Sequence, residues 1–408
     1  MTTSARKRTA VAAALCAIFS TPAVAHGDTA PALQFTHSET IAKGVQYRTF
    51  TYEGSAGTSI GYDIRADLTV PNVHPDLLHP PTVAASDTVS AMTRYGGAVA
   101  GTNADFFNIT DEHAGVPPTF SSDGVEIAGG QDLKAAVPDG QRFGPALVPG
   151  TPGTSVFGTD ASGTARLGEV TLAGSAISGR TTLKLVGLNQ FALPENGVGV
   201  YTTKWGSGSL VRPTCGSDTD RGAPCSSDVA EAVIHGGKIT QVSRTISDQA
   251  VQPGTTVLIG RENGADKLAA LGVGQRISLA YQLVAAKGPQ FDFAVGAEPI
   301  MRGGAPLDGV DTVAIAPRTG VGIRAGGHQI DLIVIDGRSS ASAGVSIAEM
   351  TDIFSALGDS SAANLDGGGS SEMVARDKKS QELLIRNVPS DGKERSVANG
   401  VGIFTTRR

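Results

Sequence analysis

Residues 330–371 read IDLIVIDGRSSASAGVSIAEMTDIFSALGDSSAANLDGGGSS, the pattern of a strand, a helix and a second strand. The run 332–335 is apolar and rich in β-branched side chains, which is typical of a strand buried on both faces. Ser346 and Glu349 have the spacing of a capping box, so a helix should begin there. Its apolar residues recur at helical spacing, and Gly358 is expected to end it.

A strand, a crossover helix and a second strand over residues 362–365 predict a βαβ unit with parallel strands. Asp336 and Asp366 would then lie at the carboxyl ends of neighbouring strands, where open α/β sheets bind ligands. The expected fold class is therefore mixed α/β or α+β. Its core would be a mixed β-sheet with this βαβ unit near the C-terminus and with β-rich insertions.

The turn after Asp366 is the first candidate binding site. Consecutive glycines let backbone amides approach a ligand closely, and hydroxyls add further hydrogen-bonding groups, so an anion or a sugar could bind there. The groups in question belong to Gly367, Gly368, Gly369, Ser370 and Ser371. The alternative is a tight turn between two strands, in which Asp366 bonds to its own backbone.

The N-terminus has the pattern of a secretory signal peptide over residues 1–25. Basic residues precede a short apolar stretch, and Ala23-Val24-Ala25 forms a cleavage site before His26. The apolar stretch is too short to span a bilayer as a stable helix. We therefore expect a secreted, extracellular protein with no membrane span and with a flexible leader over residues 26–43.

Residues 44–408 should form one domain, with a β-rich, loop-rich middle region at about 111–295. The full chain has a formal net charge of −6, which the loss of three basic signal residues would lower to −9. Such an acidic protein is a poor candidate for binding nucleic acid or anionic membrane surfaces.

Two cysteines lie outside the signal, Cys215 and Cys225, within a loop rich in Gly, Ser, Asp and Pro. A disulfide is the natural interpretation in an oxidising compartment, and it would stabilise the fold by about 2–3 kcal/mol. A metal site is the weaker alternative, because no histidine or further cysteine nearby in the sequence completes a tetrahedral set. His113 stands alone in the sequence and is interpreted as structural or surface.

A second candidate motif follows a short apolar run at residues 98–100. It reads Gly101-Thr102-Asn103-Ala104-Asp105-Phe106-Phe107. One interpretation is an amide and a carboxylate, from Asn103 and Asp105, held at a strand end by aromatic packing. The other makes the two phenylalanines core residues and the two polar residues turn formers.

A third motif, Pro317-Arg318-Thr319, places an arginine on a proline-stiffened bend between two apolar runs. The planar guanidinium of Arg318 offers paired donors that suit a phosphate or a carboxylate. The alternative is a structural salt bridge, with Asp336 or Asp366 as its partner.

Taken in order along the chain, four motifs resemble those of the phosphodiester glycosidase family. They are Asn103-Ala104-Asp105-Phe106-Phe107, Pro317-Arg318-Thr319, Ile335-Asp336-Gly337-Arg338 and Asn364-Leu365-Asp366-Gly367-Gly368-Gly369-Ser370-Ser371. The resemblance is strong from about residue 310 to the end and recognisable from about 44 to 110. Family members commonly show Asn-Gly-Gly-Phe-Phe in the first motif, where this chain adds a carboxylate at Asp105.

The resemblance implies an exported hydrolase that cleaves the bond between the anomeric carbon of a sugar and a phosphodiester. Its substrate would be a carbohydrate or a sugar phosphate, with cell-wall and extracellular glycans as candidates. Such chemistry needs donors for the departing phosphate and carboxylates for an oxocarbenium-like transition state. The implied catalytic residues are Asp366, Asp336 and Asp105. The implied binding residues are Asn103, Arg318, Thr319 and Arg338, with the glycines and serines of the turn.

Two rival functions remain open from the sequence. The first is a non-catalytic, exported carbohydrate-binding protein on the same fold. The second is a metal-dependent phosphodiesterase, in which Asp105, Asp336 and Asp366 would hold a divalent cation such as Ca²⁺ or Mg²⁺. Apart from that cation, the motifs call for no cofactor.

Overall fold

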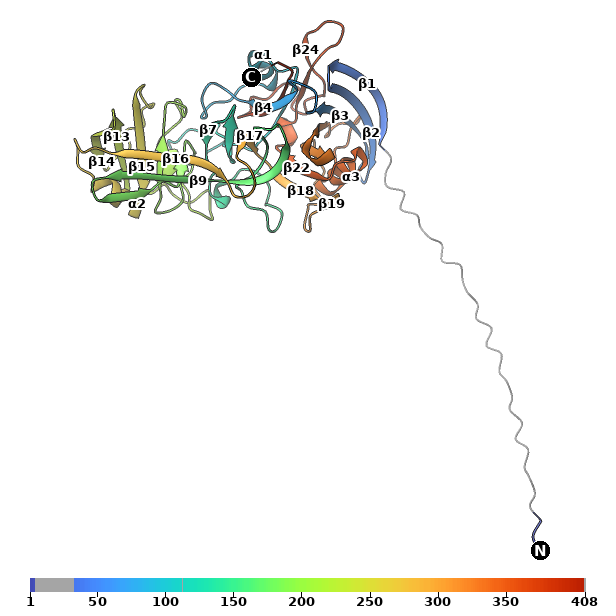
Figure 1. Cartoon of the computed structure of the whole chain (residues 1–408), viewed down its shortest axis with the longest axis horizontal. Helices are drawn as coiled ribbons and strands as arrows, with labels where there is room; N and C mark the ends of the chain where they lie inside the picture. The colour runs from blue at the N-terminus through green and yellow to red at the C-terminus, as the bar shows by residue number, and fades with distance from the viewer. Residues whose placement is uncertain (4–32, 112, 407–408) are drawn as a thin grey trace. The chain divides into compact units, whose positions relative to one another are not determined.

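β-Strands dominate the part of the chain that the structure describes, residues 1–3, 33–111 and 113–406 of a computed structural model (Figure 1). It contains twenty-five strands and three α-helices, α1 (Val89–Gly96), α2 (Asn263–Ala269) and α3 (Ile347–Leu357). Residues 33–406 belong to one compact unit. The predicted signal peptide beyond residue 3, and residues 26–32 of the predicted leader, lie outside the described residues.

The largest sheet has eight strands and holds two of the predicted motifs. In spatial order its strands are β1 (Gln34–Ala42), β2 (Val45–Gly54), β3 (Gly57–Asp67), β21 (Gln329–Ile335), β20 (Arg318–Arg324), β22 (Ser361–Leu365), β18 (Glu298–Arg302) and β19 (Ala305–Pro306). β1 pairs with β2, so the prediction of a flexible leader is wrong for residues 34–42. The strand forms because its backbone completes a ladder that local sequence pattern does not reveal.

The predicted βαβ unit is wrong, because β20 lies between the two strands that were expected to pair. β20 is antiparallel to both β21 and β22. Only residues 325–328 separate β20 from β21, so this hairpin closes a short loop and occupies the edge beside β21. Among the described strands every pair is antiparallel except β11 with β12, so the fold is mainly antiparallel β and not mixed α/β.

Helix α3 forms as the sequence predicts. The Ser346 hydroxyl accepts from the Glu349 amide at 3.2 Å, and the Glu349 carboxylate accepts from the Ser346 amide at 2.8 Å, which completes the capping box. Gly358 ends the helix with φ 90°. The buried stripe, including Phe354, packs on the eight-stranded sheet, and Gly320 of β20 lets the Phe354 ring approach because a Cβ there would lie 3.1 Å from it.

A five-stranded sheet packs against the other face. Its order is β24 (Leu383–Ile385), β23 (Met373–Arg376), β5 (Ala100–Asn103), β25 (Gly400–Phe404) and β4 (His74–Leu78). One apolar core joins the two sheets, with side chains such as Ile64, Leu332, Val334, Met373 and Val401. Helix α1 covers the five-stranded sheet through Val89 and Met92. This packing places the end of β5 beside the glycine turn that follows β22.

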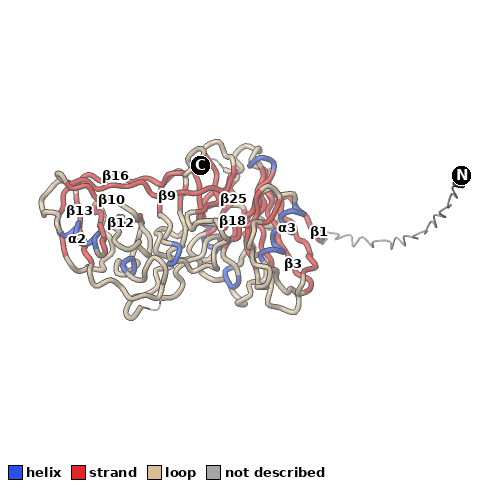
Figure 2. Tube along the Cα trace, turned by 90° about the horizontal axis from the view of Figure 1, so that it is seen from below, coloured by secondary structure: helices blue, strands red, loops and turns tan. Residues whose placement is uncertain are grey.

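The middle of the chain builds two further sheets. The seven-stranded sheet runs β10 (Thr181–Lys184), β9 (Ala165–Ser178), β8 (Ser155–Asp160), β17 (Phe291–Gly296), β6 (Glu126–Ala128) and β7 (Gln131–Lys134), with β16 (Ser278–Ala285) paired to β9. The last sheet runs β11 (Gly187–Leu188), β12 (Val198–Tyr201), β15 (Thr255–Arg261), β13 (Val229–His235) and β14 (Lys238–Ser243). Figure 2 shows β9 and β16 as a long, two-stranded extension.

None of the helices in the described residues combines the length and the apolar character that crossing a bilayer requires.

Candidate functional site

The predicted motifs meet at one edge of the eight-stranded sheet. Arg318, the first residue of β20, lies opposite Ile335 of β21, and Thr319 lies opposite Leu365 of β22. Because β21 and β22 are both antiparallel to β20, they run in the same direction and end at this edge. Asp336 and Asp366 therefore lie at the same edge of the sheet, one on each side of β20, although the expected parallel pairing is absent.

Asn103 links three of the motifs through its side chain. Its oxygen accepts from the Thr319 hydroxyl at 2.8 Å and from the Glu372 amide at 3.1 Å. Its amide nitrogen donates to the backbone carbonyl of Asp366 at 2.6 Å. Asn103 and Thr319 are both buried, and Asn103 has protein partners for both of its side-chain atoms, so it holds the site together.

Asp366 is partly exposed at the start of the glycine turn. Burial of the carboxyl group raises its pKa to about 7. A hydrogen bond from Ser370 and the charge of Arg395 both lower the pKa and so oppose this shift. A carboxyl group with a pKa in this range exchanges its proton near neutral pH, which is a property of catalytic acids and bases.

The glycine turn forms a short 3₁₀ segment, η4 (Gly368–Ser370). Gly368 has φ 65°, a conformation that favours glycine, and its amide donates to the Pro317 carbonyl at 2.9 Å. A Cβ at Gly367 would lie 2.8 Å from that same carbonyl. The turn therefore needs glycine to approach the bend that carries Arg318.

Three arginine side chains lie close to this turn, Arg338 and Arg395 through their guanidinium groups. A Cβ built on Gly367 would lie 3.7 Å from Cδ of Arg318, and one built on Gly368 would lie 3.2 Å from Nη2 of Arg338. Arg395 lies against Gly369 and donates to the Ser370 hydroxyl at 3.4 Å. Three cations beside backbone amides make this part of the site suited to an anion.

The arginines differ in how they are held. Arg318 donates from Nε to the Val345 carbonyl at 3.1 Å and from Nη2 to the Ala314 carbonyl, so the predicted alternative of a salt bridge to Asp336 or Asp366 is not formed. Arg338 is exposed and has φ 59°, an uncommon conformation for a residue other than glycine. Arg395 is fixed by Asp391.

Asp336 is buried, and its carboxylate is surrounded by donors. Tyr62 donates at 2.9 Å, the Val388 amide at 3.1 Å and the Asn387 side chain at 3.3 Å. Burial raises its pKa, and the hydrogen bond from Tyr62 opposes that shift. Asn387 also donates to the Ser371 carbonyl at 3.0 Å, so Asp336 anchors the end of the glycine turn.

Asp105 points into a buried group of charges behind the site. Its carboxylate accepts from the Gly124 amide at 2.6 Å. Burial, together with the nearby charge of Asp123, raises its pKa to about 8, while Lys134 lowers it. Lys134 is itself fully buried, and burial lowers its pKa. This environment explains why the chain tolerates a carboxylate in that motif.

Several residues of the site carry no signal in a single sequence. Glu372 follows the turn directly, is 2 % exposed, and has its pKa raised to about 9 by burial and by a hydrogen bond with Glu394. The neighbouring Ser371, which the sequence does place in the site, is also buried, and its hydroxyl has no hydrogen-bond partner among the described residues. Arg395 and Asn387 lie in loop stretches without periodicity, so only the fold brings them to the turn.

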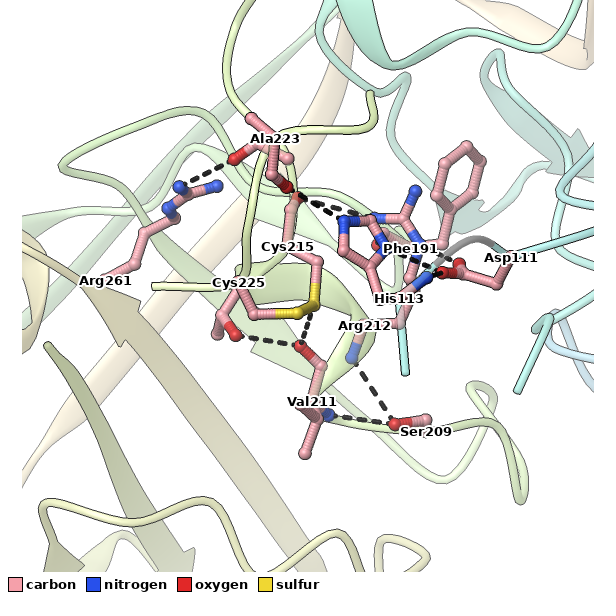
Figure 3. Close-up of a disulfide and its surroundings, with 12 residues drawn as sticks. Asp111, His113, Phe191, Ser209, Val211, Arg212, Cys215, Ala223, Cys225 and Arg261 are labelled. Carbon is pink, nitrogen blue, oxygen red and sulfur yellow. Dashed lines mark hydrogen bonds and ion pairs between the residues drawn. A yellow bond between two sulfur atoms is a disulfide. The ribbon is translucent and has the colours of Figure 1, made fainter. Parts of the chain in front are cut away.

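The predicted disulfide is present between Cys215 and Cys225, and the loop around it is built on buried polar contacts (Figure 3). His113 lies between Asp111 and the Ala223 carbonyl, with ring nitrogen distances of 2.6 Å and 2.9 Å. Arg212 pairs with Asp111 on the other side.

The disulfide is confirmed, and the fold brings a histidine close to it. His113 is distant in sequence, yet it and the two sulfur atoms lie within 4.8 Å of one another. Oxidised sulfur and a ring with both nitrogens engaged leave no free ligand there. Asp105, Asp336 and Asp366 do not form a comparable group of metal ligands within residues 33–111 and 113–406.

Comparison with solved structures supports the fold. A hypothetical protein from Synechocystis superposes with a TM-score of 0.68 at 18 % identity, over 92 % of this chain and 64 % of that one. This chain thus spans less than two thirds of that protein. A protein from Burkholderia pseudomallei K96243, described as exported, has a TM-score of 0.63 at 24 % identity, over 85 % of this chain and 74 % of the other.

A third structure is the catalytic domain of zebrafish N-acetylglucosamine-1-phosphodiester alpha-N-acetylglucosaminidase, auto-inhibited by its pro-peptide. It has a TM-score of 0.40 at 14 % identity, over 93 % of this chain and 90 % of that one. No curated protein sequence matches the chain significantly. The family model for phosphodiester glycosidase matches residues 228–404. Over these residues the chain is similar to the phosphodiester glycosidase family.

Proposed function

We propose that the protein is an exported hydrolase that cleaves the bond between the anomeric carbon of a sugar and a phosphodiester. The observation that carries the proposal is the glycine turn at Gly367–Gly369, which has three arginine side chains beside it and a carboxyl group of pKa about 7 at its start. The family match over residues 228–404 agrees with glycosidase chemistry. The signal pattern at the N-terminus supports export.

The phosphate would bind at the turn. Arg318 and Arg338 approach it from Gly367 and Gly368, and Arg395 approaches it from Gly369. These cations would neutralise charge on the departing phosphate, which is where a glycosidic bond to phosphate gains negative charge as it breaks. Because phosphate is already a good leaving group, donors and cations supply more of the stabilisation than a strong general acid would.

The sugar would lie toward Asp366. In its ionised form this carboxylate would stabilise the oxocarbenium-like transition state that glycosidic cleavage passes through. Asp336 would hold the turn in place, since Tyr62, Asn387 and Val388 already occupy its oxygens. Asp105 would not contact the sugar directly, and would influence the site through the buried charges around Lys134.

The test is to incubate the purified protein with a methyl ester of a sugar 1-phosphate in H₂¹⁸O and to analyse the products by mass spectrometry. Cleavage at the anomeric carbon places ¹⁸O in the free sugar and leaves unlabelled methyl phosphate. Label in the phosphate group instead, with activity lost on chelation by EDTA, would replace the proposal with the metal-dependent phosphodiesterase. Saturable binding without turnover of a panel of such esters would favour the carbohydrate-binding protein.

A further inference from the structure

A cavity of about 460 Å³ lies beside the proposed phosphate site. Its walls are mostly apolar and include Leu147, Val148, Ile300 and Ile347. Cavities that hold small ligands in proteins span about 300–1,000 Å³ and combine apolar walls with a few polar groups. This cavity has both properties, and its lining draws on five separate stretches of the chain.

Arg318 belongs both to this cavity and to the glycine turn. It lines the cavity, and its Cδ would lie 3.7 Å from a Cβ on Gly367. Two of its nitrogens donate to backbone carbonyls, which fixes the guanidinium group in place. A phosphate held by Arg318 at the turn would therefore have its ester oxygen within reach of the cavity.

Glu298 and Asn364 are the buried polar residues of the cavity lining. The Glu298 carboxylate accepts from Arg142 at 2.6 Å and from the Asn364 amide at 2.8 Å, so both of its oxygens are engaged. The side-chain oxygen of Asn364 is different, since it is buried and has no hydrogen-bond partner among the described residues. The two buried polar residues therefore offer a ligand one free acceptor and no free carboxylate oxygen, so polar contacts contribute little to binding in this cavity.

We propose that this cavity binds an apolar alcohol residue, alkyl or aryl, that is esterified to the phosphate of the substrate. The inference rests on the proposed function, because it takes the phosphate to lie at the glycine turn. It adds that the group on the far side of the phosphate from the sugar is hydrophobic. The sugar itself fits this cavity poorly, since neither Asp366 nor Asp336 lines it and its walls offer few hydrogen-bonding groups.

Binding of alkyl phosphates tests the inference without requiring catalysis. Isothermal titration calorimetry would compare hexyl phosphate with methyl phosphate on the purified protein. Each methylene removed from water strengthens binding by roughly fourfold, so hexyl phosphate should bind at least about tenfold more tightly even if only two methylenes are buried. Equal affinities for the two phosphates, or no binding of either, would overturn the inference.

A substitution inside the cavity locates the binding. Ala146 lines the cavity but is exposed, so Ala146→Trp should fill its space without disturbing the core. The preference for hexyl over methyl phosphate should fall to within about twofold in this variant. Ala161→Trp, at an exposed position in the loop between β8 and β9, is the matched control and should keep the full preference. A preference retained in Ala146→Trp would place the alkyl group elsewhere and refute the assignment.

Cleavage assays separate this inference from the proposed function. If neither the methyl nor the hexyl ester of a sugar 1-phosphate is hydrolysed, the proposed function fails. The calorimetric preference for hexyl phosphate then shows by itself whether the cavity binds an apolar group. If both esters are hydrolysed with equal kcat/KM, the proposed function stands and the apolar subsite is refuted. A kcat/KM that rises with chain length, and does so less in Ala146→Trp, supports both.

Discussion

The Thr319 hydroxyl donates to the side-chain oxygen of Asn103 at 2.8 Å, which joins the end of β5 to the start of β20. The same oxygen accepts from the Glu372 amide, and the amide nitrogen of Asn103 donates to the Asp366 carbonyl. One buried side chain therefore fixes both strands that border the glycine turn.

Asn103→Ala should reduce the free energy of unfolding by about 2–4 kcal/mol, because three buried partners lose their hydrogen bonds at once. Urea denaturation followed by circular dichroism measures this loss. Asn263→Ala, at an exposed position, is the control and should change stability by less than about 1 kcal/mol. A loss of similar size in both variants would contradict the linking role of Asn103.

Asp366→Asn should abolish hydrolysis and yet stabilise the fold at alkaline pH. Burial raises the pKa of Asp366 from 3.8 to about 7, so the native state binds this proton more tightly than the unfolded chain does. The resulting stabilisation is complete below about pH 4 and is lost as the pH rises through 7. Asparagine carries no charge, so the variant should melt at a higher temperature than the native protein at pH 8 and at the same temperature at pH 4.

Thermal unfolding at the two pH values measures this difference, with Asp308→Asn, an exposed carboxylate, as the control. A melting temperature of Asp366→Asn that stays below that of the native protein at pH 8 would argue against a carboxyl group whose ionisation is disfavoured in the folded protein. For the native protein, kcat/KM should rise as the pH increases through about 7, because the proposed role of Asp366 requires its ionised form. A flat profile between pH 6 and 8 would exclude that role.

Arg338→Ala should raise the KM for a sugar phosphodiester by about tenfold while leaving the melting temperature unchanged. Its guanidinium group is exposed and lies at the glycine turn, so its loss removes a cation without removing packing. Steady-state kinetics at two ionic strengths provides the measurement, since a phosphate contact weakens with salt. Arg180→Ala, in the exposed turn between β9 and β10, should match the native protein. Equal kinetics for Arg338→Ala and the native protein would remove Arg338 from the proposed site.

Replacing both Cys215 and Cys225 with serine should lower the free energy of unfolding by about 2–3 kcal/mol, because the bridge closes a short loop. The contacts that Ala223 makes with His113 lie within this loop, so hydrogen exchange should rise at residues 216–224 first. The unreduced native protein is the reference, and native protein treated with dithiothreitol should resemble the double variant. Unchanged exchange over the loop would show that the polar contacts hold it without the bridge.

The sequence predicts the local elements of the site better than their pairing. The capping box and the apolar stripe of α3 are short-range patterns, and both are present as predicted. The predicted parallel pairing of β21 with β22 is wrong because the sequences of the two strands do not indicate which strand each one pairs with. The four-residue connection from β20 to β21 places β20 beside β21 instead. That hairpin can be predicted only when Arg318 is taken as the first residue of a strand.

The motifs lie at one edge of the sheet even though the predicted pairing of β21 with β22 is wrong, and the reason is geometric. Two strands that are both antiparallel to a third run the same way, so their polar ends still meet. The roles of single side chains were harder to predict. The motif predicts that Asn103 binds substrate, and this stays a prediction, while the hydrogen bonds of its side chain go to the protein. No sequence pattern marks Arg395, which only the fold brings to the turn.

The family match begins at residue 228, but the two sheets around the glycine turn also contain strands from before that residue. Strands β1 to β3 complete the larger one, and β4 and β5 complete the smaller. An expression clone that starts at residue 228 would leave unsatisfied β-edges where those strands belong and would lack Asn103 altogether. The protein is therefore best produced from residue 33 onward, since the boundary of the recognisable sequence is not a boundary of the folding unit.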